Sequence, residues 1–166
     1  RPYPHLGVTA GAGLRLRLGA GFGLQAEALY TEKGDGGLHL GYWEFPVTGR
    51  FEYPRRLFGF TAAVAAGVAP ARLVRCAFWT GPGQVQTTGA SAVAGYRSSC
   101  LMMITESDDI GVVASLEVQR TFGPGRIGAE VRYTRGWSNL VSDYACCNVQ
   151  NRSVALIVGY ELGILR

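Results

Sequence analysis

The sequence has few charged residues and no apolar run long enough to cross a membrane as a helix. Charged residues make up 17% of the 166 residues, whereas apolar residues make up 48% and glycine occurs 24 times. This composition is poor in charge for a soluble domain and too polar for a helical membrane protein. The longest uncharged apolar stretch, Leu57 to Ala71, contains Pro70 and is shorter than the roughly 20 residues that a spanning helix needs. We therefore interpret this stretch as a β-strand.

Several functional signatures are also missing. The net charge is +4, but the basic residues form no cluster typical of a nucleic-acid-binding surface, so we expect no nucleic-acid partner. Gly19-Ala-Gly-Phe-Gly23 lacks the strand-to-helix context of a phosphate-binding loop, and we interpret it as a hairpin turn. The sequence begins without Met or a signal peptide, so we expect that a signal was cleaved or that the sequence starts inside the native protein.

No set of residues predicts catalysis or metal binding. His39, Asp35 and Ser107 could be drawn as a Ser/His/Asp set, but no motif fixes it, and solvated loop residues are the simpler interpretation. The cysteines lack a C-x-x-C spacing and lie far from both histidines, which argues against a metal site. We therefore expect no enzyme, no cofactor and no metal ion.

A two-residue alternation runs through even the charged segments of the chain. From Leu6 to Leu18 every even residue is apolar, while Arg15 and Arg17 share the other face with glycines. Because side chains on a strand point to opposite faces in turn, such a segment has one apolar and one polar face. A soluble sandwich shows this pattern too, but its recurrence in seven long segments, without a competing helical pattern, is typical of a membrane-spanning β-barrel.

We predict a single domain over residues 1–166 that contains seven visible strands. These strands are Leu6–Leu18, Gly21–Lys33, Leu38–Glu52, Leu57–Arg75, Ile110–Thr121, Arg126–Arg135 and Arg152–Gly163. Three connections are tight (Gly19-Ala20, Tyr53–Arg56 and Phe122–Gly125), Gly34–Gly37 is short, and Cys76–Asp109 and Gly136–Asn151 are long. Short turns at one end and longer loops at the other are typical of bacterial outer-membrane barrels, with the short side in the periplasm.

The polar face of the predicted strands is charged. Five basic and five acidic residues share it: Arg15, Arg17, Glu27, Lys33, Glu44, Arg50, Glu117, Glu130, Arg132 and Glu161. A charge facing lipid at mid-depth would cost roughly 2–4 kcal/mol, so this face is expected to point inward. The balance of signs predicts an interior filled by paired side chains rather than a wide channel. We interpret Glu27, Glu44 and Glu130 as structural, because buried charges require partners. Their expected partners are Arg15, Arg50 and Arg132.

Seven antiparallel strands cannot close an antiparallel barrel, because the first and last would run in the same direction. Bacterial single-chain barrels have even strand numbers. We therefore predict an all-β, antiparallel, transmembrane up-and-down β-barrel of eight strands, whose first strand precedes Arg1. A barrel of eight strands has an interior just filled by side chains.

Aromatic residues are predicted to lie near both ends of the strands. Those on the loop side are Tyr30, Trp43, Tyr133 and Trp137, and those on the turn side are Phe51, Tyr53, Phe58 and Phe122. Two aromatic bands are favoured at the two interfaces of a membrane, although packing at the ends of an ordinary sheet is the alternative.

Four cysteines border or lie within the two long loops. An even number in polar segments predicts disulfides in an oxidising compartment. Adjacent cysteines seldom bond to each other. Our first choice therefore joins Cys146 and Cys147 to Cys76 and Cys100, and the alternative is a Cys76–Cys100 bond with a vicinal pair.

Two segments resemble a known family. Ala26-Glu-Ala-Leu-Tyr-Thr-Glu-Lys-Gly34 is similar to a segment of the PorT-type outer-membrane β-barrel domain family, and Tyr42-Trp-Glu-Phe-Pro-Val47 resembles the strand that follows it there. The resemblance implies a small, OmpX-like eight-stranded barrel in a bacterial outer membrane, without a shared catalytic site. It also implies a local bulge at Pro46, which cannot donate to the strand ladder. The chain departs from the family by lacking the first strand and a terminal aromatic residue, so the true C-terminus stays open.

We expect a structural or accessory subunit, or a surface-interaction protein, of the bacterial envelope. Its expected partners are the outer-membrane lipid and another envelope protein, bound through the extracellular loops Ala77–Asp109 and Gly136–Asn151. Four apolar residues in the longer loop are the candidate contact, with packing onto the barrel mouth as the alternative: Leu101, Met102, Met103 and Ile104.

Two other functions stay open. A narrow pore for small solutes is disfavoured by the charge-filled interior. A soluble lipocalin-like ligand binder would have an apolar lumen and a polar exterior, which is the reverse of the polarity predicted here.

Overall fold

The structure is a computed structural model that describes residues 7–35, 38–56, 58–79, 85–88, 108–137 and 152–162. Its strands are β1 (Thr9–Gly19), β2 (Phe22–Asp35), β3 (Leu38–Glu44), β4 (Val47–Glu52), β5 (Phe60–Trp79), β6 (Val85–Thr88), β7 (Asp108–Phe122), β8 (Gly125–Gly136) and β9 (Arg152–Leu162). Among these residues, no helix is long and apolar enough to cross a membrane.

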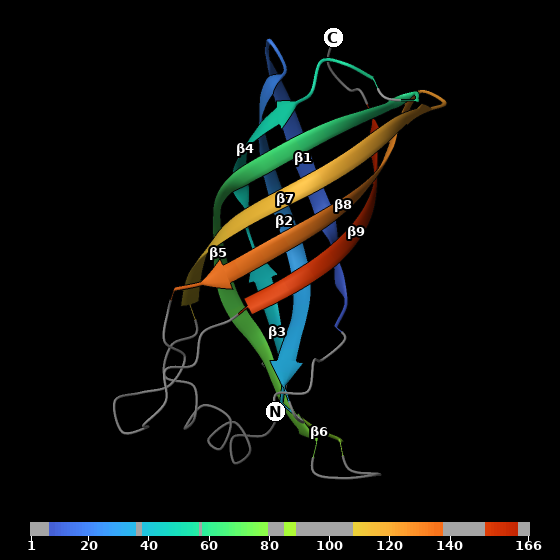
Figure 1. The fold of residues 1–166 in the computed structure, drawn as a ribbon. Helices are drawn as coiled ribbons and strands as arrows, with labels where there is room; N and C mark the ends of the chain where they lie inside the picture. The colour runs from blue at the N-terminus through green and yellow to red at the C-terminus, as the bar shows by residue number, and fades with distance from the viewer. Residues whose placement is uncertain are drawn as a thin grey trace.

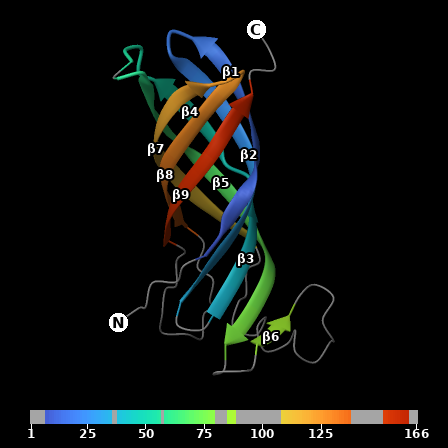
Figure 2. The same ribbon diagram turned by 90° about the vertical axis from the view of Figure 1, so that its right-hand side faces the viewer.

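The strands form one antiparallel sheet that curls into a barrel (Figures 1 and 2). Hydrogen-bonded neighbours follow the order β1-β2-β3-β5-β7-β8-β9. Strand β4 continues the path of β3 and, like β3, pairs with β2 on one side and β5 on the other. Each wall strand therefore pairs with the next along the chain. The predicted all-β, antiparallel, up-and-down barrel is confirmed.

The two ends of this sheet, β1 and β9, run in the same direction, because every step between them is antiparallel. The strand order of the described residues contains no ladder between them. Side chains nevertheless cross this seam, since Arg15 Nη1 on β1 lies 2.7 Å from Glu161 Oε2 on β9. The predicted eighth strand, placed before Arg1, lies outside the described residues and stays a prediction.

Apolar residues cover the outside of the barrel. On β5 the outward positions are apolar from Phe60 to Pro70, a span that fits the about 9–11 residues of a membrane-crossing strand. Beyond it, the charged Arg72 is exposed, and exposed charged residues lie at the same end of β7, β8 and β9. We call the exposed apolar surface the outer belt; its larger members include Leu14, Leu16, Leu24, Val47, Phe60, Val64, Val68, Ile110, Leu116, Val118, Ile127, Val131, Val154, Leu156 and Val158. The exposed charges at its loop end include Arg72, Asp108, Arg135 and Arg152.

The bulge predicted at Pro46 is wrong. Glu44 of β3 pairs with Ala71, and Val47 of β4 pairs with Val68. The register of β3 and β4 against β5 is therefore the same on both sides of Pro46. The proline keeps one bond, because the amide of Glu27 donates to its carbonyl at 3.0 Å. Only the reciprocal bond, which needs a proline N–H, cannot form. The register instead shifts between Gly41 and Tyr42, near the loop end.

The start of the predicted long loop Cys76–Asp109 is also corrected. Strand β5 continues to Trp79 and pairs with β6, which forms within the predicted loop. This hairpin extends beyond the barrel (Figure 2). The sequence explains the longer strand, because Phe, Trp, Val and Thr are residue types that favour strands.

Candidate functional site

The turn end of the barrel interior holds the largest group of ion pairs. Arg15 of β1 contacts Glu117 at 3.2 Å and Glu161 at 2.7 Å, and its Nε donates to Gln25 at 3.0 Å. Arg50 of β4 also pairs with Glu117, so that one carboxylate joins β1, β4 and β7. These contacts link strands far apart in the sequence across the lumen.

The rim of this end continues the same network. Arg17 contacts Glu161 at 3.2 Å, and Arg126 Nη1 lies 3.2 Å from Glu52 Oε2. The Nε atom of Arg50 is 3.5 Å from Glu52 Oε1. We call these seven charged residues the turn-end network: Arg15, Arg17, Arg50, Glu52, Glu117, Arg126 and Glu161.

Two smaller clusters lie nearer the loop end. Arg132 of β8 contacts Glu27 across the lumen and Glu130 on its own strand, both at 2.7 Å. Further along, Lys33 forms an ion pair with Glu44, which also accepts a hydrogen bond from Thr31 at 3.2 Å. Most of these charges are buried, and each has an opposite charge beside it, as buried charges require.

Glycines provide the room for these side chains. A Cβ atom added to Gly13 would lie 2.8 Å from Glu27 Cγ, and one added to Gly128 would lie 2.7 Å from Glu117 Oε1. Both glycines stand opposite long polar side chains in the register, Glu27 and Gln119. The interior is therefore packed by alternating large charged residues with residues that have no side chain.

The structure brings every predicted inner charged residue into an ion pair, but not always with the predicted partner. Glu27 and Glu130 pair with Arg132, whereas Glu44 pairs with Lys33 instead of an arginine. The reason is position along the barrel axis, because Glu44 lies near the loop end, beside Tyr42 and Lys33.

The sequence analysis missed Glu52 and Arg126, which pair with each other. The alternation pattern could have identified them, because both occupy positions that face inward on their strands. Both also lie at the ends of predicted strands. Gln25 and Gln119 were missed as well, because the interpretation considered charged residues alone; both are buried and bonded within the network.

Aromatic residues lie at both ends of the wall. At the turn end, the rings of Phe22 and Phe51 are 4.9 Å apart, and Tyr160 donates to the carbonyl of Phe122 at 3.2 Å. At the loop end, Tyr30 and Trp43 make an edge contact at 6.0 Å. Other exposed aromatic residues near the two ends are Tyr53, Phe58, Tyr133 and Trp137.

Other predicted residues cannot be placed in a site. Cys76 and His39 have described backbones only, within β5 and β3. Cys100, Cys146, Cys147, Ser107 and the candidate contact Leu101–Ile104 lie outside the described residues. Their disulfides and contacts stay predictions.

No protein-family model matches the chain, and searches of curated proteins and of solved structures return no match. The resemblance of Ala26–Gly34 and Tyr42–Val47 to the PorT-type family therefore stays a prediction.

Proposed function

We propose that the chain is a non-enzymatic, integral outer-membrane β-barrel protein that acts as a structural or accessory subunit, or as a surface-interaction protein, of the bacterial envelope. The observation that carries the proposal is the polarity of the wall, with charged side chains buried inside and apolar side chains exposed outside. In the described residues the buried polar positions include Arg50, Glu117 and Arg132, while Leu14 and Leu156 are exposed.

This polarity favours a non-aqueous exterior. Monomeric soluble proteins rarely expose contiguous apolar patches larger than a few hundred Å². The outer belt instead runs over every wall strand and, on β5, β7, β8 and β9, ends at exposed charged residues on its loop side. Lipid would remove that apolar surface from water, at roughly 25 cal/mol per Å². Aromatic residues lie at both ends of the belt, and this arrangement supports the proposal because membrane interfaces favour such residues.

The two alternative functions fit this geometry less well. A narrow pore needs a continuous polar path, but Arg15, Arg50 and Glu117 meet across the lumen and occupy it. A soluble lipocalin-like binder needs an apolar lumen. The buried polar set, which includes Glu130 and Thr134, is the opposite of such a lumen.

A role in interaction rests on the loop end. There β5 and β6 form a hairpin that extends past the outer belt (Figure 2). A rigid wall that supports longer connections is a common arrangement for binding another protein. Co-purification from native membranes in a mild detergent would identify such a partner.

The membrane proposal is tested by fractionation and by electrophoresis. We expect the chain to remain with the outer membrane until detergent is added, and to migrate differently on gels before and after heating, because the barrel stays folded in cold detergent. Purification of a soluble monomer without detergent would refute the proposal.

The disulfide part of the proposal needs a separate test. We expect Cys76, Cys100, Cys146 and Cys147 to be oxidised, since an extracellular loop is exposed to an oxidising environment. Mass spectrometry of unreduced peptides distinguishes the two predicted pairings. Four free thiols would remove the disulfides from the proposal without affecting the barrel.

A further inference from the structure

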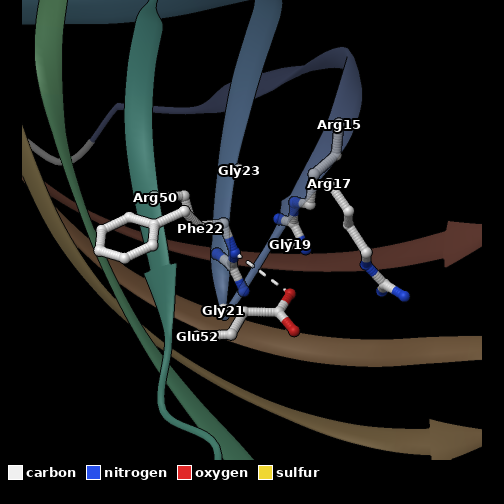
Figure 3. Close-up of a pocket in the computed structure, with 8 residues that line it drawn as sticks. All are labelled: Arg15, Arg17, Gly19, Gly21, Phe22, Gly23, Arg50 and Glu52. Carbon is white, nitrogen blue, oxygen red and sulfur yellow. Dashed lines mark ion pairs between the residues drawn. The ribbon is translucent and has the colours of Figure 1, made fainter.

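The turn end of the interior contains a hollow of about 150 Å³ between the β1–β2 turn and β4 (Figure 3). Its lining residues are Arg15, Arg17, Gly19, Gly21, Phe22, Gly23, Arg50 and Glu52. Three of these residues are arginines and one is a glutamate, so the lining has an excess of positive charge. The hollow has the volume of about five water molecules at roughly 30 Å³ each, which is enough for a small oxyanion group.

Arg50 is the buried floor of this hollow. Its side chain is 2% exposed, and its Nη1 atom pairs with Glu117. Its Nη2 atom has no hydrogen-bond partner among the described residues, and its Nε atom, 3.5 Å from Glu52, has none with hydrogen-bond geometry. A buried guanidinium with unused donors favours an acceptor, because leaving such donors unpaired costs free energy.

The nearby carboxylates are already engaged. Glu117 pairs with Arg15 and Arg50, and Glu161 pairs with Arg15 and Arg17. Glu52 lines the hollow, but its Oε2 atom pairs at 3.2 Å with Nη1 of Arg126, which does not line the hollow. The turn-end network thus has four arginines against three glutamates, which leaves one excess positive charge and favours an anion of charge −1.

One arginine at the hollow can move toward a ligand. The Arg17 side chain is 53% exposed and has one ion pair, with Glu161. If Arg17 turns inward, Glu161 still has its ion pair with Arg15, in which Arg15 Nη1 lies 2.7 Å from Glu161 Oε2. The space beside Gly19 is open, because a Cβ atom added there would meet nothing within 4 Å. In contrast, a Cβ at Gly21 would meet the Glu52 carbonyl at 2.6 Å, so the opposite wall is closely packed.

We propose that this hollow binds a singly charged oxyanion group, either a phosphodiester or a carboxylate, through Arg50 and Arg17. Arg50 donates from Nη2 at the floor, and Arg17 donates from the rim. Guanidinium groups suit such ligands, because their planar N–H donors match two oxygens on one atom. This site lies at the end opposite the long loops and adds a ligand to the proposed barrel function.

The test follows the arginine side chains directly. The folded, ¹⁵N-labelled chain is kept in maltoside micelles, which contain no phosphate group, and titrated with dimethyl phosphate, with acetate and, at equal ionic strength, with chloride. We expect saturable shifts of the Arg50 and Arg17 Nε–H signals with one of the two oxyanions. Saturation by dimethyl phosphate alone assigns a phosphodiester, and saturation by acetate alone assigns a carboxylate; saturation by both supports the shared oxyanion chemistry.

Two variants make the test specific. Arg17→Gln removes the exposed donor and should weaken binding at least about tenfold, because hydrogen bonds from a charged donor to a charged acceptor are the stronger ones. Arg56→Gln is the matched control, because Arg56 is exposed at the same end but does not line the hollow. Equal unfolding of the two variants verifies that both fold. Equal shifts with chloride, no saturation with either oxyanion, or unchanged affinity in Arg17→Gln would overturn the proposal.

Discussion

The two faces of strand β7 differ more than most neighbouring surfaces of a protein. Leu116 and Val118 point outward and are 64% and 48% exposed, whereas Glu117 and Gln119 point inward and are 7% and 3% exposed. The four residues are consecutive, so all of them belong to the same stretch of one strand. The difference lies in what each face contacts. The inner face contacts arginines of β1 and β4, whereas no part of the chain that the structure describes covers the outer face.

This contrast shows that the pairing of charges organises much of the interior, beside buried apolar residues such as Leu29 and Val113. A buried charge without a partner is strongly destabilising, so the inner face is stable only as a complete set of pairs. The outer face is favourable where its surroundings are as apolar as its side chains. The following changes test the two halves of this comparison separately.

The largest effect is expected from Glu117→Gln. The change keeps the shape of the side chain but removes the charge shared by Arg15 and Arg50. We expect a loss of about 3–5 kcal/mol in the free energy of unfolding, as for other broken buried pairs. Urea unfolding of the folded barrel measures it. Glu161→Gln is the control: its carboxylate is more exposed, so its loss should be smaller. Equal losses would contradict the role of burial.

Val64→Arg tests the outer face. Val64 is 49% exposed in the middle of the outer belt. In lipid, an arginine there should cost roughly 2–4 kcal/mol and impair assembly. Thr61→Arg, on the inner face beside Gln119, is expected to be tolerated better because it can join the polar network. Assembly yield and unfolding free energy measure both variants. If the two are tolerated equally, the outer belt does not face lipid.

Arg72→Gln should have the smallest effect. Its ion pair with Asp108 spans 3.9 Å, and the two side chains are 72% and 74% exposed. Exposed pairs of this kind contribute about 0–1 kcal/mol, so the unfolding free energy should barely change. A double-mutant cycle with Asp108→Asn measures the coupling. A coupling well above 1 kcal/mol would show that the loop end of the belt is less solvated than its exposure indicates.

Much of the wall could be predicted from the sequence because alternation fixes faces. Leu14, Leu16 and Arg15 fall on the predicted sides, and a shift by one residue would reverse them all. The partners inside could not be predicted in the same way. Whether Glu44 meets an arginine or Lys33 depends on strand tilt and stagger, and these are properties of the assembled sheet.

The strand limits and the hollow were less predictable for different reasons. β6 forms only because β5 continues far enough to pair with it, so its existence depends on a neighbour. The hollow depends on where Gly21 and Arg50 meet across two strands, for which no local motif exists. Pro46 misled the prediction, because a proline can remove one bond without changing register.

Two prolines lie side by side in the wall, Pro46 between β3 and β4 and Pro70 in β5, and they have a mechanical consequence. Pro46 accepts from the Glu27 amide at 3.0 Å, and Pro70 accepts from the Phe45 amide at 2.8 Å. Each therefore contributes one hydrogen bond where an ordinary residue pair would exchange two. The two weakened pairs, Glu27–Pro46 and Phe45–Pro70, are adjacent in the sheet. They form a line of reduced hydrogen bonding, which we call the crease. Bending of the wall under load should concentrate along this crease, while the register on either side of it is preserved.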